Sequence, residues 1–284
     1  MKAFLIPFLL GLIFSAVMMV MSNPVSSETA TEKPLINGYI VQPLPETKDQ
    51  REARLAKVAG RRTGTMLLVH RGATAFAPEN SLEAFLAAME HGADGVEIDI
   101  RRTTDGVFYL FHDDELDRMT NGTGKVREKT YYELLEAGLR RAPGRGARMA
   151  RIPTLDAFFN LARKHAMLLH LDVKESDIEE DLIAMIDRYD LWPHIVHVTP
   201  FPNSNKIRFH EKAKLFEYKG WLPAGEPDSD SVKNFLAQEG YMVFVKDDPS
   251  RGAEILGKKK IDSLPVTNDL RQLWGPDGPV KAGE

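Results

Sequence analysis

The 284-residue sequence contains no cysteine, so it can form neither a disulfide framework nor a lipoprotein cysteine anchor. Cysteine usage therefore does not indicate a compartment. The sequence also lacks a long basic run interleaved with aromatic residues, and its formal net charge is -4. Because that charge gives no general attraction to phosphate backbones, nucleic acid is not an expected partner.

The first residues have the composition of an export signal. Lys2 precedes an apolar run over residues 3–21, and small residues follow at 25–27. We interpret residues 1–27 as a cleaved signal peptide and expect a periplasmic or secreted protein. The apolar run approaches the ~20 residues that cross a bilayer, so the alternative is an uncleaved anchor at residues 3–21 that associates the protein with a membrane.

The remaining chain is expected to contain an N-terminal leader segment, residues 28–63, with one short helix, and a single domain, residues 64–284. In the domain, short apolar runs alternate with amphipathic stretches, a pattern typical of βα units around a parallel sheet. Eight strands are expected, at residues 66–70, 95–100, 107–112, 167–174, 195–199, 214–219, 241–246 and 263–267. Eight strands in the roughly 250 residues after the signal peptide predict a (β/α)8 TIM barrel, although a turn rather than a helix joins the second and third strands. An open, doubly wound sheet is the alternative.

Paired polar residues occur in two of the expected strands. Glu97 and Asp99 are two residues apart in "GVEIDI", so both side chains lie on one face of the strand. Asp172 and Lys174 repeat this spacing in "LDVK". Adjacent carboxylates repel each other unless a cation lies between them or they reach solvent. These acids are therefore candidate metal ligands.

Histidines end two of the expected strands. His70 precedes Arg71 at the end of the first strand, and His112 ends the third. In a parallel barrel the carboxyl ends of the strands open on one face, where catalytic groups gather. Carboxylates suit Ca²⁺ or Mg²⁺, cationic side chains neutralise phosphate oxygens, and two imidazoles can divide base and acid work. The combination predicts phosphoryl transfer, whereas a glycosidase needs paired carboxylates without this excess of positive groups.

The ordered motifs resemble those of the glycerophosphodiester phosphodiesterase family. They are His70-Arg71-Gly72, Pro78-Glu79-Asn80-Ser81, Gly92-Ala93-Asp94, Glu97-Ile98-Asp99, Thr104-Asp105-Gly106, His112-Asp113, "LDRMTNGTGKV", "IPTL" from Ile152 and "LDVK", with "LPVTND" as a looser match near the C-terminus. Two departures stand out. The family usually has Glu at the position of Asp172, and its tryptophan-bearing strand near the C-terminus is matched at best by "YMVFVKDD".

The resemblance implies a barrel that hydrolyses glycerophosphodiesters to glycerol 3-phosphate and an alcohol. It implies a Ca²⁺ or Mg²⁺ ion held by Glu97, Asp99 and Asp172, with His70 and His112 as base and acid and with Arg71 and Lys174 on the substrate phosphate. In the family's usual mechanism the glycerol 2-hydroxyl attacks phosphorus, and the resulting cyclic phosphate is then hydrolysed.

Two other functions fit the same residues. One is a lysophospholipase D or phospholipase C-like activity on a lipid phosphodiester such as a lysophospholipid, and the other is a catalytically inactive barrel that binds phosphodiesters. The arginine-rich residues 140–151 are interpreted as a solvated charge run, with a lid over the active site as the alternative. His91, His165, His194, His197 and His210 lie outside the motifs and are expected to be structural.

Overall fold

The computed structural model describes residues 35–36, 39–40, 42–140 and 150–261. Several expectations fall outside these residues and stay predictions. They are the signal peptide at 1–27 with its alternative anchor at 3–21, the strand at 263–267, and most of the arginine-rich segment. No helix among the described residues is long and apolar enough to span a membrane.

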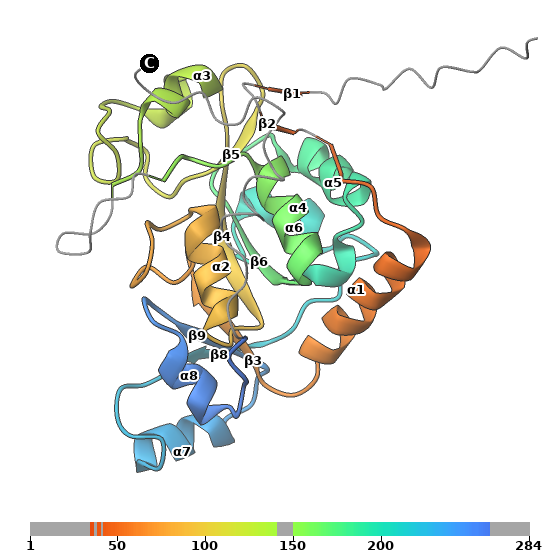
Figure 1. Ribbon diagram of the computed structural model, residues 1–284, viewed down its shortest axis with the longest axis vertical. Coiled ribbons are helices and arrows are strands. Elements are labelled where there is room, and N and C mark those ends of the chain that lie inside the picture. Colours follow the sequence, from red (N-terminus) through yellow and green to blue (C-terminus); the bar gives the residue numbers. More distant parts are fainter. Residues whose placement is uncertain (1–34, 37–38, 41, 141–149, 262–284) are drawn as a thin grey trace, which may run out of the picture. The chain divides into compact units, whose positions relative to one another are not determined.

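Among the described residues, a parallel sheet of six strands forms the centre of the domain (Figure 1). Its strands are β3 (Met66–His70), β4 (Gly95–Arg102), β6 (Leu168–Val173), β7 (Ile195–Val198), β8 (Tyr218–Trp221) and β9 (Met242–Val245). Their order is β7-β6-β4-β3-β9-β8, so the first strand lies beside the last. In a doubly wound sheet the first strand would instead lie between the two halves of the sheet, and the last strand would lie at an edge.

This cyclic order is that of the expected barrel, and it excludes the doubly wound alternative. Within the described residues the sheet ends at β7 and at β8, which do not pair with each other.

The expected strand at residues 107–112 has a different role from the other strands. It forms β5 (Phe108–Leu110), which pairs antiparallel with β4 and lies outside the parallel path. The turn between them allows no crossover helix, and an antiparallel hairpin is the pairing that so short a connection permits. The hairpin returns the chain toward the open end of the sheet, where the Phe111 amide donates to the Asp99 carbonyl over 3.0 Å. The strand expected at 214–219 is also displaced, to 218–221.

Helices follow or precede most of the parallel strands, as expected for βα units. They are α1 (Lys48–Arg61), α2 (Leu82–Glu90), α3 (Tyr131–Glu136), α4 (Leu155–His165), α5 (Glu179–Arg188), α6 (Asn205–Arg208), α7 (Asp230–Ala237) and α8 (Ser250–Ile255), with short 3-10 turns η1 (Val126–Glu128), η2 (Trp192–His194) and η3 (Pro202–Ser204) and a small hairpin of β1 (Leu35–Ile36) and β2 (Tyr39–Ile40). The helix expected in the leader segment is α1. Its buried Arg54 bonds to Glu46 and to Asp190, so this segment packs on the domain.

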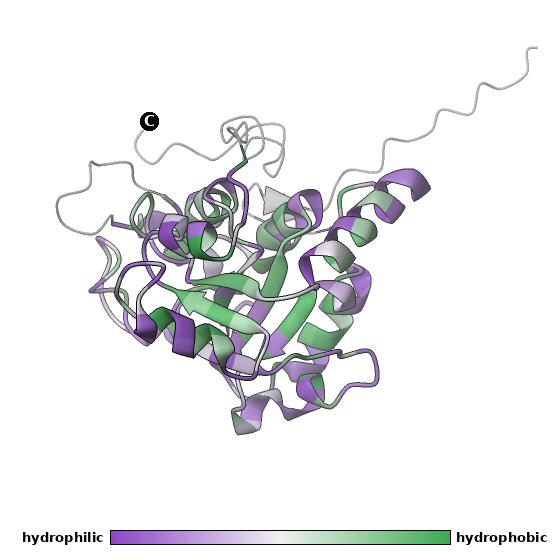
Figure 2. Cartoon of the chain, turned by 90° about the horizontal axis from the view of Figure 1, so that it is seen from below, coloured by the Kyte–Doolittle hydropathy of each residue, from purple (hydrophilic) through white to green (hydrophobic). Residues whose placement is uncertain are grey.

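The strands of the sheet are largely apolar (Figure 2). Their apolar side chains lie on both faces, because both faces are covered. On β3, Leu67 and Val69 pack in the large core shared with the helices, whereas Met66 and Leu68 belong to a second cluster on the opposite face, together with Val58 of α1. Along this second face the next residue of β3 is the polar His70. We call this second face, which carries Met66, Leu68 and His70, the inner face of the sheet. It therefore changes from apolar at the start of β3 to polar at its carboxyl end.

Candidate active site

The strand register arranges the expected site residues in two neighbouring rows. Glu97 of β4 lies between His70 of β3 and His170 of β6. One pleat further along, Asp99 lies beside Asp172. Because residues two apart in a strand share a face, all five side chains belong to the inner face of the sheet.

The three expected metal ligands come together. Ligand atoms of Glu97, Asp99 and Asp172 all lie within 4.8 Å of one another. Glu97 and Asp99 are 2% and 0% exposed. Burial, with repulsion from Asp99 and Asp172, raises the pKa of the Glu97 carboxyl well above its usual value. Oδ1 of Asp172 is buried and accepts no hydrogen bond, and Oδ1 of Asp99 is buried beside the Lys174 ammonium. Two buried carboxylates and the partly buried Asp172, close enough to share one ion, fit a hard divalent cation such as Ca²⁺ or Mg²⁺.

Cationic side chains surround the buried Asp99. Lys174 Nζ lies 2.9 Å from Asp99 and 2.7 Å from Asp172, and Arg71 Nε lies 3.3 Å from Asp99. The Asn80 amide also donates to Asp99 Oδ2 over 2.6 Å. Burial alone would raise the pKa of Asp99, but Lys174, Arg71 and this hydrogen bond outweigh it and lower the pKa. Arg71 and Lys174 therefore lie beside the carboxylates, where a bound phosphate would need positive charge.

Asn80, a member of one of the sequence motifs, is bonded to Asp99. It is buried, with a φ of 54°, and its side chain bonds to both the backbone and the carboxylate of Asp99. The helix that follows, α2, is capped by Ser81, whose hydroxyl accepts a hydrogen bond from the Ala84 amide. An asparagine tolerates this left-handed backbone better than most residues do, which explains its place at the turn into α2.

His70 is positioned as a neutral imidazole. Burial and the neighbouring Arg71 lower the pKa of His70 to about 4. Its ring makes an edge-to-face contact with Trp221 at a centroid distance of 5.3 Å. At neutral pH the ring is therefore uncharged and able to accept a proton.

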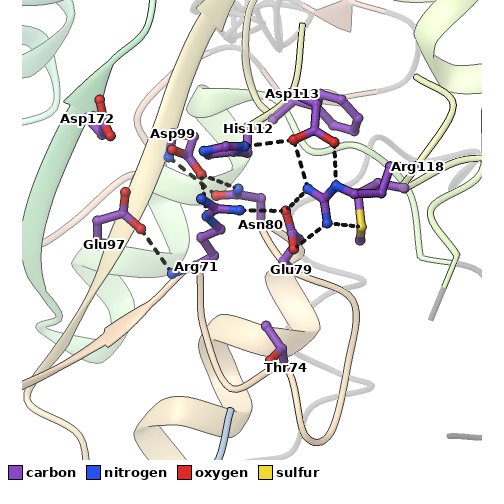
Figure 3. Close-up of polar contacts among 12 residues, drawn as sticks. Arg71, Thr74, Glu79, Asn80, Glu97, Asp99, His112, Asp113, Arg118 and Asp172 are labelled. Carbon is purple, nitrogen blue, oxygen red and sulfur yellow. Dashed lines mark hydrogen bonds and ion pairs between the residues drawn. The ribbon is translucent and has the colours of Figure 1, made fainter. Parts of the chain in front are cut away.

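His112 lies just beyond β5 and is held from two sides. The buried Arg101 donates to its backbone carbonyl over 2.8 Å, and the ring Nδ1 bonds to Asp113 over 2.7 Å. Since a carboxylate can only accept, Nδ1 carries the proton and Nε2 is left for other partners. The chain of hydrogen bonds continues from Asp113 to Arg118 and from Arg118 to Glu79, as Figure 3 shows. Sequence reasoning placed these three residues in motifs without assigning them a role.

A cavity of about 270 Å³ opens beside the carboxylates. It is lined by His70, Glu97, His170, Asp172, His197, Thr199, Tyr218, Trp221 and Phe244. His197, expected to be structural, thus lies on the cavity wall, where its ring contacts His170. The tryptophan-bearing strand is β8 with Trp221, not the "YMVFVKDD" segment, which supplies β9 and Phe244. Its sequence, "YKGW", has too little apolar alternation to predict a strand.

Residues 70–208 match the Glycerophosphoryl diester phosphodiesterase family. This part of the chain belongs to that family. The glycerophosphodiester phosphodiesterase of Caldanaerobacter subterraneus subsp. tengcongensis is 38% identical over 141 residues, which cover 46% of this chain and 56% of that protein. A glycerophosphodiester phosphodiesterase of Bacillus subtilis is 29% identical over 198 residues, which cover 62% of this chain and 67% of that protein. The chain spans about half the length of the first two relatives it matches.

A solved structure of a member of the family has the same fold. The glycerophosphodiester phosphodiesterase of Agrobacterium tumefaciens superposes with a TM-score of 0.54 at 20% identity, over 67% of this chain and 99% of that one. This likeness confirms the expected barrel fold. The matched residues 70–208 include all seven expected site residues, so the family resemblance and the site coincide.

Proposed function

We propose that the protein is an exported, metal-dependent phosphodiesterase that hydrolyses glycerophosphodiesters to glycerol 3-phosphate and an alcohol. The observation that carries this proposal is the cluster of Glu97, Asp99 and Asp172, with Arg71 and Lys174 on the same carboxylates. Three acids and two cations beside an open cavity suit a phosphate bound together with a divalent ion. The ion would be held by the three acids and would supply positive charge to the phosphate oxygens.

The two imidazoles divide the proton transfers. His70, uncharged at neutral pH, takes the proton from the glycerol 2-hydroxyl as that oxygen bonds to phosphorus. As the bond from phosphorus to the alcohol oxygen breaks, His112, doubly protonated as the imidazolium, gives that oxygen its Nε2 proton and keeps its Nδ1 proton in the bond to Asp113. Arg71 and Lys174 hold the phosphate oxygens. Water then opens the cyclic phosphate, with the two imidazoles exchanging roles.

The test is hydrolysis of glycerophosphocholine and glycerophosphoethanolamine by the purified protein, first with chelator and then with Ca²⁺ or Mg²⁺ restored. We expect glycerol 3-phosphate only when metal is present. Asp172→Asn should abolish the activity, whereas Asp181→Asn, at an exposed ion pair with Arg102, is the matched control. Full activity after exhaustive chelation would refute metal dependence, and binding of the diester without turnover would indicate the inactive barrel.

A second substrate class is favoured by the aromatic wall of the cavity. Trp221 and Tyr218 line it and are 44% and 42% exposed, which gives an apolar rim next to the site. Such a rim suits the acyl chain of a lysophospholipid, as lysophospholipase D activity requires. Lysophosphatidylcholine is therefore the comparison substrate. Faster turnover of it than of glycerophosphocholine, lost in Trp221→Ala, would support this alternative.

Export rests on residues 1–27, which lie outside the described residues. We propose that this segment directs the protein to the periplasm or the medium and is removed near Ser27. Intact-mass measurement of the exported protein tests this. A chain that still begins at Met1 and sediments with membranes would instead show that residues 3–21 form an anchor.

A further inference from the structure

Arg118 forms an unusually complete set of bonds for a residue that the proposed reaction does not use. Its Nε and Nη2 donate to the two carboxylate oxygens of Asp113 over 2.5 and 2.9 Å. Its Nη2 and Nη1 also donate to the two oxygens of Glu79 over 2.7 and 3.1 Å. An exposed ion pair usually contributes little, but a guanidinium bound in this forked way to two carboxylates fixes their orientation.

The bonds continue from Arg118 to the proposed acid. Asp113 Oδ1 accepts both from Arg118 and from His112 Nδ1 (Figure 3). On the other side of Arg118, Glu79 Oε1 also accepts a hydrogen bond from Arg71 over 3.1 Å. Each of the two carboxylates that Arg118 binds is therefore also bonded to an expected site residue, Asp113 to His112 and Glu79 to Arg71. Burial opposes ionisation of Asp113, but the bonds from Arg118 and His112 lower the pKa of its carboxyl to about 2. Asp113 thus stays an acceptor and does not take the proton of His112.

The backbone at His112 does not need Arg118. The buried Arg101 already donates to the carbonyls of Phe111 and His112 over 3.1 and 2.8 Å. The side chain of His112, by contrast, is 33% exposed, and its ring is hydrogen-bonded to Asp113. Arg118 therefore restricts the rotation of the Asp113 carboxylate and of the His112 imidazole bonded to it.

We propose that Arg118 is a positioning residue that sets the orientation and tautomer of the His112 imidazole through Asp113. This inference rests on the proposed function for its kinetic consequence, because a misdirected His112 no longer delivers its proton to the leaving alcohol. It assigns a role to the arginine of the "LDRMTNGTGKV" motif.

The kinetic test compares two glycerophosphodiesters, one that releases choline and one that releases p-nitrophenol. In Arg118→Gln, kcat on glycerophosphocholine should fall about 10- to 100-fold, as part of the effect of general acid catalysis, with a loss below about threefold on the p-nitrophenyl ester. Adding Arg118→Gln to His112→Ala should cause little further loss. Equal losses on both substrates, or an undiminished loss in the His112→Ala background, would overturn the proposal.

Arg51→Gln is the matched control. Arg51 is also 49% exposed and also forms a forked pair with an aspartate, Asp190, but it lies on α1. The Arg51→Gln variant should keep full activity, while its unfolding midpoint should change by about as much as that of Arg118→Gln. If Arg118→Gln does not fold, Arg118→Lys should give an intermediate loss on glycerophosphocholine, because it keeps the charge but not the fork.

A second measurement does not depend on activity. Nitrogen NMR of His112 at alkaline pH, where imidazoles are neutral, should show the proton on Nδ1 in the wild type and a mixture of tautomers in Arg118→Gln. An unchanged tautomer would refute the inference even if the enzyme is active. If the wild type hydrolyses neither diester, the proposed function fails, and the NMR result still decides the role of Arg118.

Discussion

Replacement of Glu97 by glutamine should have opposite effects on the protein with and without metal. Glu97 is 2% exposed, and burial with repulsion from Asp99 and Asp172 raises its pKa well above the usual value. Such an acid binds more protons in the folded state, so its contribution to stability is lost as pH rises from the unfolded pKa through the folded one. The amide carries no charge and keeps an oxygen for the Arg71 amide hydrogen. Without metal, Glu97→Gln should therefore unfold at or above the wild-type temperature at neutral pH.

With metal bound, the wild type should instead unfold at a higher temperature than Glu97→Gln. A ligand that binds only the folded state at 100 times its Kd adds about 2.7 kcal/mol to the unfolding free energy. For a domain of roughly 200 residues this raises Tm by about 5 to 10 °C. Glu97→Gln removes one of three carboxylate ligands, so most of that increase should disappear.

The assay is thermal unfolding followed by circular dichroism, with chelator, Ca²⁺ or Mg²⁺. Asp156→Asn is the control, because Asp156 is also buried with a raised pKa but is bonded to Tyr189 on the helix side, away from the three ligands. It should keep the full metal-induced increase. The same increase in Glu97→Gln as in the wild type would refute the metal assignment, and a lower Tm of the variant in chelator would refute the argument from charge repulsion.

Other predictions follow from single residues. His112→Ala should cost about 10²- to 10⁴-fold on glycerophosphocholine but much less on the p-nitrophenyl ester, whereas His70→Ala should impair both, and a reversed pattern in steady-state assays would exchange the two roles. Asp172→Glu, which restores the usual acid of the family, should retain activity, and a metal titration that shows weaker binding would argue for a geometry specific to this chain. Burial lowers the pKa of His194 to about 3, so the unfolding free energy should fall as pH drops from 6.5 toward 3, by up to about 1.4 kcal/mol per unit, and urea denaturation should show a smaller slope in His194→Gln.

The sequence was sufficient to predict the cluster of candidate metal ligands because the relevant geometry is local. Residues two apart on a strand share a face, so the pairing of Glu97 with Asp99 could be read directly from "GVEIDI". The third acid, Asp172, was placed by the same spacing and by the family motif, and the register with Asp99 brings it alongside. The barrel followed from the alternation of strands and helices, although the strand ending near His112 was wrongly counted as one of its parallel members.

The remaining parts of the site depend on contacts between residues distant in sequence, which alternation does not encode. Trp221 reaches His70 across about 150 positions, from a short strand whose glycine and half-exposed side chains resemble a loop. Arg118 and Glu79 come from two different loops and meet only because the hairpin of β4 and β5 turns the chain back over the strand ends. The same hairpin explains why His112 can face the carboxylates without belonging to a barrel strand. A loop position needs its own restraints, and the bonds from Arg101 to the backbone and from Asp113 to the ring supply them. The three candidate metal ligands, by contrast, are held by the sheet itself.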